Sequence, residues 1–199
     1  AEESLSWAFP EPSALSVSML ELWYGSGDAF SLTLLAPDGS RHGPVARGEV
    51  GEFQAGEVKA TIDARDVDGH PDGNSTVLLE WPEGRPAEGA WAVEIVADAV
   101  RGDGAWDAWL PEGDGAGSGS EGFTSHLSPY ATLVDAANAV SAVTVAAHVS
   151  RNCWEGADGD YCLDPPVEPG AIAAFSSAGP TRDGRRKPDL AAPGQVILA

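Results

Sequence analysis

The residues best suited to chemistry are the histidines, serines and aspartates, which could form a serine–histidine–aspartate triad. Such a triad needs a hydroxyl nucleophile, a histidine that takes its proton and a carboxylate that orients the histidine. The chain contains four histidines, and His126, His148 and Asp135 are the candidate members. Any chain with this composition offers such combinations by chance, so catalytic roles depend on geometry. We expect His148 to end a buried strand as a core or rim side chain, and His70 and His126 to lie in loops.

Carboxylates form a second candidate site. Asp63, Asp66, Asp68 and Asp72 crowd into twelve residues that also contain glycines, and Ca²⁺ prefers oxygen ligands on flexible loops. The spacing differs from that of an EF-hand loop, and no carboxylate follows at a fixed bidentate position. We interpret the segment as a solvated hairpin loop, with calcium binding as the alternative, and predict no other metal or cofactor. Residues 158–160 (DGD) are interpreted as a turn.

Four tryptophans form a third group. Trp81, Trp91, Trp106 and Trp109 could stack on sugar rings and so line a carbohydrate-binding face. Tryptophans in alternating strands also fill the core of a sheet, because each indole buries a large area. We favour the core interpretation and keep the carbohydrate face as the alternative.

The two cysteines, Cys153 and Cys162, bracket a turn rich in glycine and aspartate. A zinc site would need about four ligands, and no histidine or second cysteine pair lies at ligand spacing. We therefore predict a local disulfide, with two free buried thiols as the alternative. Because disulfides persist in oxidising compartments, the protein is predicted to be secreted or extracellular.

Charge excludes several function classes. The 199 residues include 31 acidic and 11 basic side chains, a formal net charge of −20. Residues 1–117 hold 22 acids and 6 bases, a net of −16. Nucleic acids and anionic membrane surfaces are therefore not expected partners. No apolar run approaches the roughly 20 residues of a membrane-spanning helix. The start has no signal-peptide pattern, so we interpret it as a processed or excised end.

The elements that would position these residues are mostly strands. Apolar and polar residues alternate in several short segments separated by Gly, Pro and Asp turns, a pattern typical of antiparallel sheets with one buried face. The expected strands cover residues 19–24, 30–34, 57–63, 76–81, 90–96 and 106–110. We predict a mainly β fold: a jelly-roll-like antiparallel β-sandwich over residues 1–115.

The character of the chain changes after a stretch rich in glycine and serine. Residues 116–122 are predicted to be a linker by composition. Residues 140–147 (VSAVTVAA) then form a nearly continuous run of small, mostly apolar residues, which suits a strand covered on both faces in a parallel α/β sheet. Residues 135–138 are expected to form a short helical turn. Residues 123–199 are thus predicted to be a second, α/β segment.

The end of the chain carries a specific motif. Residues 175–184 (FSSAGPTRDG) and 185–194 (RRKPDLAAPG) closely resemble the FSS-x-GPT-x-DGR-x-KPD-x-x-APG stretch of subtilisin-like serine proteases, the S8 peptidase family. Residues 142–147 look like the core strand of that family, so the resemblance covers residues 127–199. The front half is similar, more loosely, to a β-sandwich that some bacterial members insert between their oxyanion-hole asparagine and their nucleophilic serine. The segments 23–24, 36–39, 89–91 and 106–109 carry this second match.

The resemblance implies a partial α/β protease core without catalytic residues. The family places its triad and oxyanion asparagine in Asp-Thr/Ser-Gly, His-Gly-Thr-His, Ala-x-Gly-Asn and Gly-Thr-Ser-Met-Ala segments, and the sequence contains none of them. His42-Gly43 is followed by Pro44, and Asn138 lacks the glycine of the oxyanion loop. We predict a non-catalytic fragment of a secreted endopeptidase whose triad lies outside this chain. The alternative is a stand-alone sandwich that binds protein or glycan, with or without calcium.

The same interpretation sets the expected partners. They are the rest of the parent protease and the protein or peptide substrate of that parent. A second copy of the chain is another expected partner, because an apolar strand edge at residues 140–147 that lacks neighbours invites association.

Overall fold

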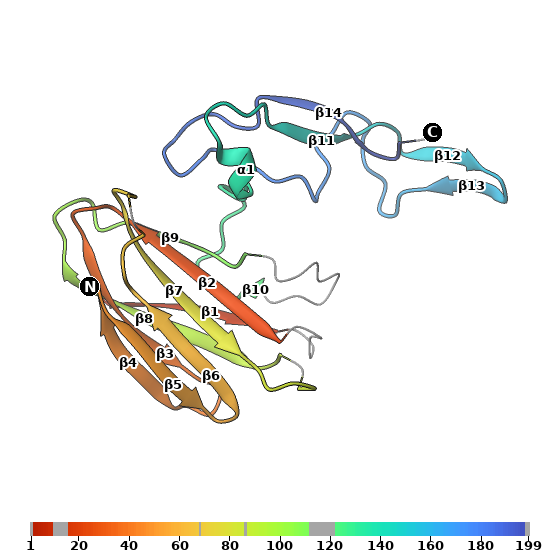
Figure 1. Cartoon of the computed structure of the whole chain (residues 1–199). Coiled ribbons are helices and arrows are strands. Elements are labelled where there is room, and N and C mark those ends of the chain that lie inside the picture. Colours follow the sequence, from red (N-terminus) through yellow and green to blue (C-terminus); the bar gives the residue numbers. More distant parts are fainter. Residues whose placement is uncertain (1, 10–15, 68, 86, 112–121, 198–199) are drawn as a thin grey trace. The chain divides into compact units, whose positions relative to one another are not determined.

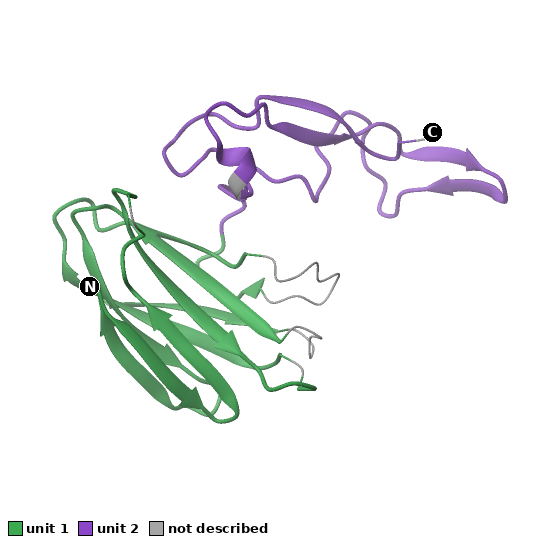
Figure 2. Ribbon diagram, viewed as in Figure 1, with its two compact units in different colours: residues 1–127 green, residues 128–199 purple. Residues whose placement is uncertain are grey.

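The computed structural model describes residues 2–9, 16–67, 69–85, 87–111 and 122–197. The chain divides into two compact units, unit 1 (Ala1–Leu127) and unit 2 (Ser128–Ala199) (Figure 2). Nearly all of the predicted linker lies outside the described residues. Its last residue belongs to β10 (Gly122–Phe123), which pairs with β1 (Glu2–Ala8) in unit 1.

Unit 1 consists of two five-stranded antiparallel sheets (Figure 1). The first sheet has the order β10-β1-β8-β3-β4 and contains β8 (Ala90–Ala99), β3 (Ala29–Leu35) and β4 (Arg41–Ala46). The second has the order β5-β6-β7-β2-β9 and contains β5 (Val50–Ala55), β6 (Val58–Asp63), β7 (Gly73–Glu80), β2 (Val17–Tyr24) and β9 (Trp106–Trp109). This confirms the predicted β-sandwich; the jelly-roll type stays a prediction.

Alternation along the strands builds the core of the sandwich. In β2, Leu20, Leu22 and Tyr24 are buried while the residues between them are partly exposed. In β8, Trp91 and Val93 repeat the pattern. Side chains of successive strand residues point to opposite faces, so each strand contributes one row to a single buried layer. One continuous cluster of buried apolar residues fills that layer.

A buried carboxylate fixes the turn between β2 and β3. Asp28 has no exposed surface, and its Oδ1 accepts hydrogen bonds from the backbone N–H groups of Arg101 and Gly102, both at 2.7 Å. Its Oδ2 accepts another from Gly104 at 3.1 Å. The backbone carbonyl of Asp28 also accepts a bond from the guanidinium of Arg47 at 2.6 Å. The side chain and backbone of this one residue thus tie together three loops of unit 1.

Unit 2 contains little regular structure. Helix α1 (Asp135–Asn138) is a single turn, and β11 (Val145–Val149) pairs in parallel with β14 (Leu190–Gln195). β12 (Cys153–Gly156) and β13 (Gly159–Cys162) form an antiparallel hairpin. In the described part of the chain, no helix is long and apolar enough to cross a membrane.

The strand expected at residues 140–147 begins later and is less covered than its composition suggests. Residues 140–144 lie outside the strand, and β11 runs from Val145 to Val149. Val140 is 80% exposed and Val145 is 50% exposed, so the expectation of a strand buried on both faces is wrong for the described chain. β11 pairs with β14 in a two-stranded sheet, and the described part of unit 2 buries too few apolar side chains to cover both of its faces.

The hairpin of unit 2 carries the predicted disulfide. Cys153 and Cys162 lie directly opposite each other in the β12–β13 register and are bonded. The rings of Trp154 and Tyr161 stack beside them with centroids 5.8 Å apart. Most of the hairpin is exposed. A largely solvated two-stranded hairpin is marginal by itself, so the disulfide is its main constraint.

We expect loss of this disulfide to loosen the hairpin alone. Closing a loop of this length is worth about 2–3 kcal/mol, and the hairpin lies in unit 2. In the double variant Cys153→Ser/Cys162→Ser, amide hydrogen exchange between residues 153 and 162 should accelerate by roughly 30–150-fold. Exchange of the strands of unit 1, measured in the same samples, is the internal control. Equal acceleration in β2 and β8 would contradict a local role.

Candidate functional site

The three histidines His70, His126 and His148 contact different neighbours, and the side chain of Asp135 lies outside the described part of the structure. The ring of His70 packs against Trp23, and that of His126 against Trp106, with centroids 4.8 and 5.4 Å apart. His148 lies partly buried on β11, with Nδ1 3.2 Å from the carbonyl oxygen of Val149. Both His70 and His126 lie outside the strands, as predicted.

One serine–histidine pair was missed by the sequence analysis. Ser40 Oγ and His42 Nε2 lie 2.9 Å apart where β4 begins. The nearby Asp38 accepts the backbone N–H of Ser40 at 2.8 Å, and hydrogen bonding from the Ser40 hydroxyl lowers the pKa of Asp38. A nucleophilic serine needs the carboxylate on the far side of the histidine, whereas here it holds the serine. Residues two apart in an extended chain point to the same side. The spacing of Ser40 and His42 could therefore have indicated this pair.

Two carboxylates of the acidic segment form ion pairs with arginines. Asp63 pairs with Arg65, and this hydrogen-bonded pair lowers the pKa of Asp63. Asp66 pairs with Arg47 at 2.8 Å. Asp68 lies outside the described residues. Over the described ranges, no group of three or more histidine, cysteine, aspartate or glutamate side chains could hold a metal ion. Calcium binding stays a prediction.

The tail motif of unit 2 forms a network that joins two segments of the chain. The Asp183 carboxylate bonds to Arg185 and to the hydroxyl of Thr181, and these two groups lower the pKa of Asp183 to about 2. Buried Lys187 donates to the carbonyl of Ala142 at 2.5 Å and to Asp189 at 2.7 Å.

Further bonds extend this network to the strand pair. Asp189 accepts the backbone N–H of Thr144 at 2.7 Å, directly before β11. Ser176 Oγ accepts the N–H of Ala147 at 3.1 Å. The motif residues therefore hold β11 and β14 in place, which is a structural role.

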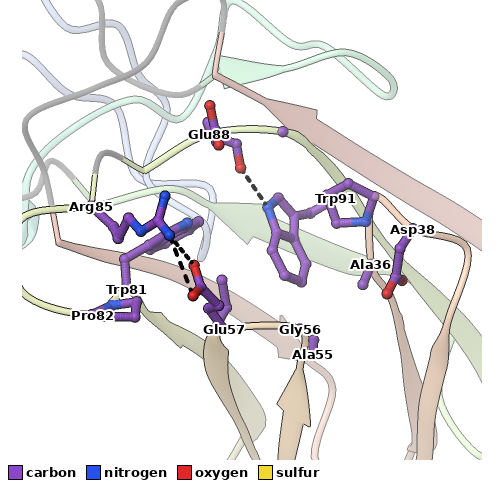
Figure 3. Close-up of a pocket in the computed structure, with 13 residues that line it drawn as sticks. Ala36, Asp38, Ala55, Gly56, Glu57, Trp81, Pro82, Arg85, Glu88 and Trp91 are labelled. Carbon is purple, nitrogen blue, oxygen red and sulfur yellow. Dashed lines mark hydrogen bonds and ion pairs between the residues drawn. The ribbon is translucent and has the colours of Figure 1, made fainter.

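A pocket with a volume of about 400 Å³ opens at one end of the sandwich. This lies within the range of ligand sites, about 300–1,000 Å³. Four parts of unit 1 line it: residues 36–38 after β3, residues 55–58 at the turn from β5 to β6, five residues between β7 and β8 (Trp81, Pro82, Arg85, Glu88 and Gly89), and Trp91 on β8. Figure 3 shows their side chains converging on it.

Two tryptophans line the pocket. Trp81 and Trp91 belong to the buried core cluster, as the sequence analysis favoured, and their rings meet edge to face with centroids 5.9 Å apart. The indole N–H of Trp91 donates to the carbonyl of Glu88 at 3.1 Å (Figure 3). Gly89 has φ +96°, and a Cβ there would lie 2.6 Å from Pro37. The other two tryptophans of this group, Trp106 and Trp109, are partly exposed on β9.

Charged side chains surround these rings. Asp38, Glu57, Glu88 and Arg85 all line the pocket. Arg85 forms an ion pair with Glu57 at 3.0 Å, and both side chains are more than 60% exposed (Figure 3). The lining therefore combines indole rings with three carboxylates and one guanidinium. None of these four charged residues was predicted from the sequence as part of a site.

Comparison with known proteins gives a match among solved structures. No family model matches the chain, and no curated protein does. The structure of the Clostridium perfringens CspB protease is similar to it, with a TM-score of 0.71 and 22% sequence identity. The match covers 100% of this chain and 38% of that one. The chain therefore has the fold of a part of that molecule and spans well under half of its length.

Proposed function

We propose that this chain is a non-catalytic segment of a secreted subtilisin-like serine endopeptidase. The carrying observation is that a protease structure matches the whole chain, both the sandwich and the segment with the parallel strand pair. The resemblance of residues 175–194 to the tail motif of subtilisin-like proteases supports the same family, and these residues hold β11 against β14. The disulfide supports an oxidising, extracellular location.

In this proposal, unit 2 is part of a larger α/β core. Its described residues bury few apolar side chains, namely Leu133, Ala146, Val149 and Ala173. Large apolar side chains that are exposed instead are Tyr130, Val134, Val140, Val143, Val145, Tyr161, Ile172, Phe175, Leu190 and Ile197. Exposed apolar surface of this extent is typical of a buried interface. The rest of the protease core would cover it.

The sandwich is proposed to be an accessory domain of the protease. It buries a continuous apolar cluster of its own, around which it would fold without the catalytic residues. In the parent it would shape access of the peptide substrate or stabilise the catalytic core. Peptide bonds would be cleaved by a serine, histidine and aspartate located elsewhere in the parent, through an acyl-enzyme.

The reading frame around this sequence tests the proposal. We expect Asp-Thr/Ser-Gly, His-Gly-Thr-His and Ala-x-Gly-Asn segments before residue 1, and a Gly-Thr-Ser segment shortly after residue 199. A frame that encodes residues 1–199 without any of these segments would contradict it. The chain would then be a stand-alone binding module, and self-association of unit 2, measured by sedimentation, would explain its exposed apolar side chains.

A further inference from the structure

We propose that the fold of unit 2 makes the Asp158–Gly159 turn a modification site, at which the peptide bond migrates spontaneously from the main chain to the side chain of Asp158. The product is an isoaspartyl residue. This inference goes beyond the proposed function, because it concerns the covalent chemistry of the disulfide-bonded hairpin and needs no protease core. It rests on the exposure of this turn and on the contacts that restrain the other described Asp-Gly pairs.

Asp-Gly sequences isomerise through a five-membered ring. The main-chain nitrogen of the glycine attacks the carboxyl carbon Cγ of the aspartate, so that an N–Cγ bond forms and the carboxyl oxygen leaves as water. Water then opens the resulting succinimide at either carbonyl, which restores the aspartyl peptide or yields the isoaspartyl one. No oxidant, reductant or other co-reactant is needed. The reaction requires a carboxyl group that can reach the nitrogen, and glycine offers no side chain that blocks this approach.

The Asp158–Gly159 turn meets this requirement. Both residues are exposed, and within the described residues no hydrogen bond or ion pair holds the Asp158 carboxylate. Gly159 has φ +135°, and a Cβ there would meet no atom within 4 Å. The turn closes the hairpin of β12 and β13, most of which is exposed. Such a hairpin is marginal by itself, so its backbone opens locally at a low cost in free energy.

The Asp183–Gly184 pair has the same two residues but is held at both reacting groups. Its carboxylate bonds to Arg185 at 2.7 Å and to the hydroxyl of Thr181, and the N–H of Gly184 donates to the carbonyl of Thr181 at 2.8 Å. Arg185 and Thr181 lower the pKa of Asp183 to about 2, which disfavours the neutral carboxyl group from which water leaves. We therefore expect this pair to isomerise slowly in the folded chain.

The other described Asp-Gly pairs are also restrained. In Asp38–Gly39, the glycine N–H donates to the carbonyl of Ala36 at 2.9 Å. In Asp103–Gly104, it donates to the buried carboxylate of Asp28 at 3.1 Å. In Asp72–Gly73, the glycine is buried where β7 begins. Among the described pairs, Asp158–Gly159 is therefore the one most open to ring closure.

Isomerisation would change the tip of the hairpin. An isoaspartyl residue adds one carbon to the main chain, and only two residues separate the paired Gly156 and Gly159. Loop length fixes the register of a hairpin, so the pairs nearest the turn would be lost first. The disulfide would still keep Cys153 beside Cys162. The modification would therefore loosen the tip without releasing the ends.

Peptide mapping of the full chain after ageing tests the proposal. The chain would be kept for several weeks at neutral pH and physiological temperature and then digested. Isoaspartyl peptides would be separated by chromatography and located by fragmentation at their additional main-chain bond. We expect residue 158 to isomerise at least about tenfold faster than residue 183 in the folded chain. In urea, where neither pair is held, the two rates should agree within about threefold.

Asp158→Glu is the matched variant, because it keeps the charge but would have to close a six-membered ring. It should abolish the isoaspartyl signal of the hairpin and leave the rate at residue 183 unchanged. The proposal is wrong if residue 158 gains no isoaspartyl form, or if residues 158 and 183 isomerise equally fast in the folded chain. A difference between them that persists in urea would also contradict it, because the neighbouring residues, and not the fold, would then set the rates.

Discussion

Replacement of Gly73 by alanine should destabilise the sandwich by about 3 kcal/mol. Gly73 lies opposite Tyr24 in the β2–β7 register, and a Cβ at this position would lie 2.1 Å from a ring carbon of Tyr24. The Tyr24 ring is fully buried and packs edge to face on Phe30 at 5.0 Å. It therefore cannot move aside without disturbing the core, and overpacked cores lose typically 1–3 kcal/mol.

Urea unfolding followed by tryptophan fluorescence measures this effect. The matched control is Gly122→Ala in β10, because a Cβ there meets no atom within 4 Å and the glycine has no left-handed φ. We expect its free energy of unfolding to stay within about 0.5 kcal/mol of the parent value. Equal stability of the two variants would mean that the ring of Tyr24 does not occupy the space above Gly73.

Replacement of Asp28 should have the second largest effect and should depend on pH. Asp28→Ala leaves three backbone N–H groups without the carboxylate that accepts them. These hydrogen bonds are part-buried and their acceptor is buried, and hydrogen bonds to a charged group are worth more than neutral ones. We therefore expect the melting temperature at pH 7 to fall by roughly 5–10 °C. The melting temperature of Asp28→Asn should fall less, because the amide oxygen of asparagine still accepts hydrogen bonds. Some loss remains, because its NH₂ group faces another donor.

The pH dependence follows from the hydrogen bonds that hold the carboxylate. The N–H of Gly102, followed by those of Arg101 and Gly104, lowers the pKa of Asp28 below its ordinary value despite burial. A lowered pKa stabilises the folded state above the unfolded pKa, about pH 4, and this contribution disappears as the pH falls through the folded pKa. The melting temperature of the parent should approach that of Asp28→Asn below pH 4. If the melting temperatures of the parent and of Asp28→Asn differed by the same amount from pH 7 to pH 2, the carboxylate would not be the origin of the effect.

Most strands that the sequence predicted lie in the interior of the sheets, and one of them, β9, lies at an edge. Alternation identified β2, β3, β6, β7 and β8 because each has one face in the core. It missed the interior strand β1 and the edge strands β4, β5 and β10. β4 contains Gly43 and Pro44, residues that suit an edge strand but interrupt a period-two pattern.

The candidate sites were harder to predict, because they depend on contacts between distant segments. The cysteine pair was predictable from its spacing across one turn. By contrast, the pocket joins residues from 36 to 91, and no local pattern links Glu57 to Arg85. Asp28 resembles any turn aspartate until its partners at residues 101–104 are known. Periodicity describes which face of a strand is buried, but not which loops meet.

Identification of the reactive serine tests the central claim most directly. The complete product of the reading frame, and separately the chain of residues 1–199, would be treated with a fluorophosphonate probe and digested for mass spectrometry. We predict a single modified serine in the complete product, outside residues 1–199, and none in the isolated chain. A modified serine within residues 1–199 that is lost on its mutation to alanine, or no modified serine in the complete product, would contradict the account.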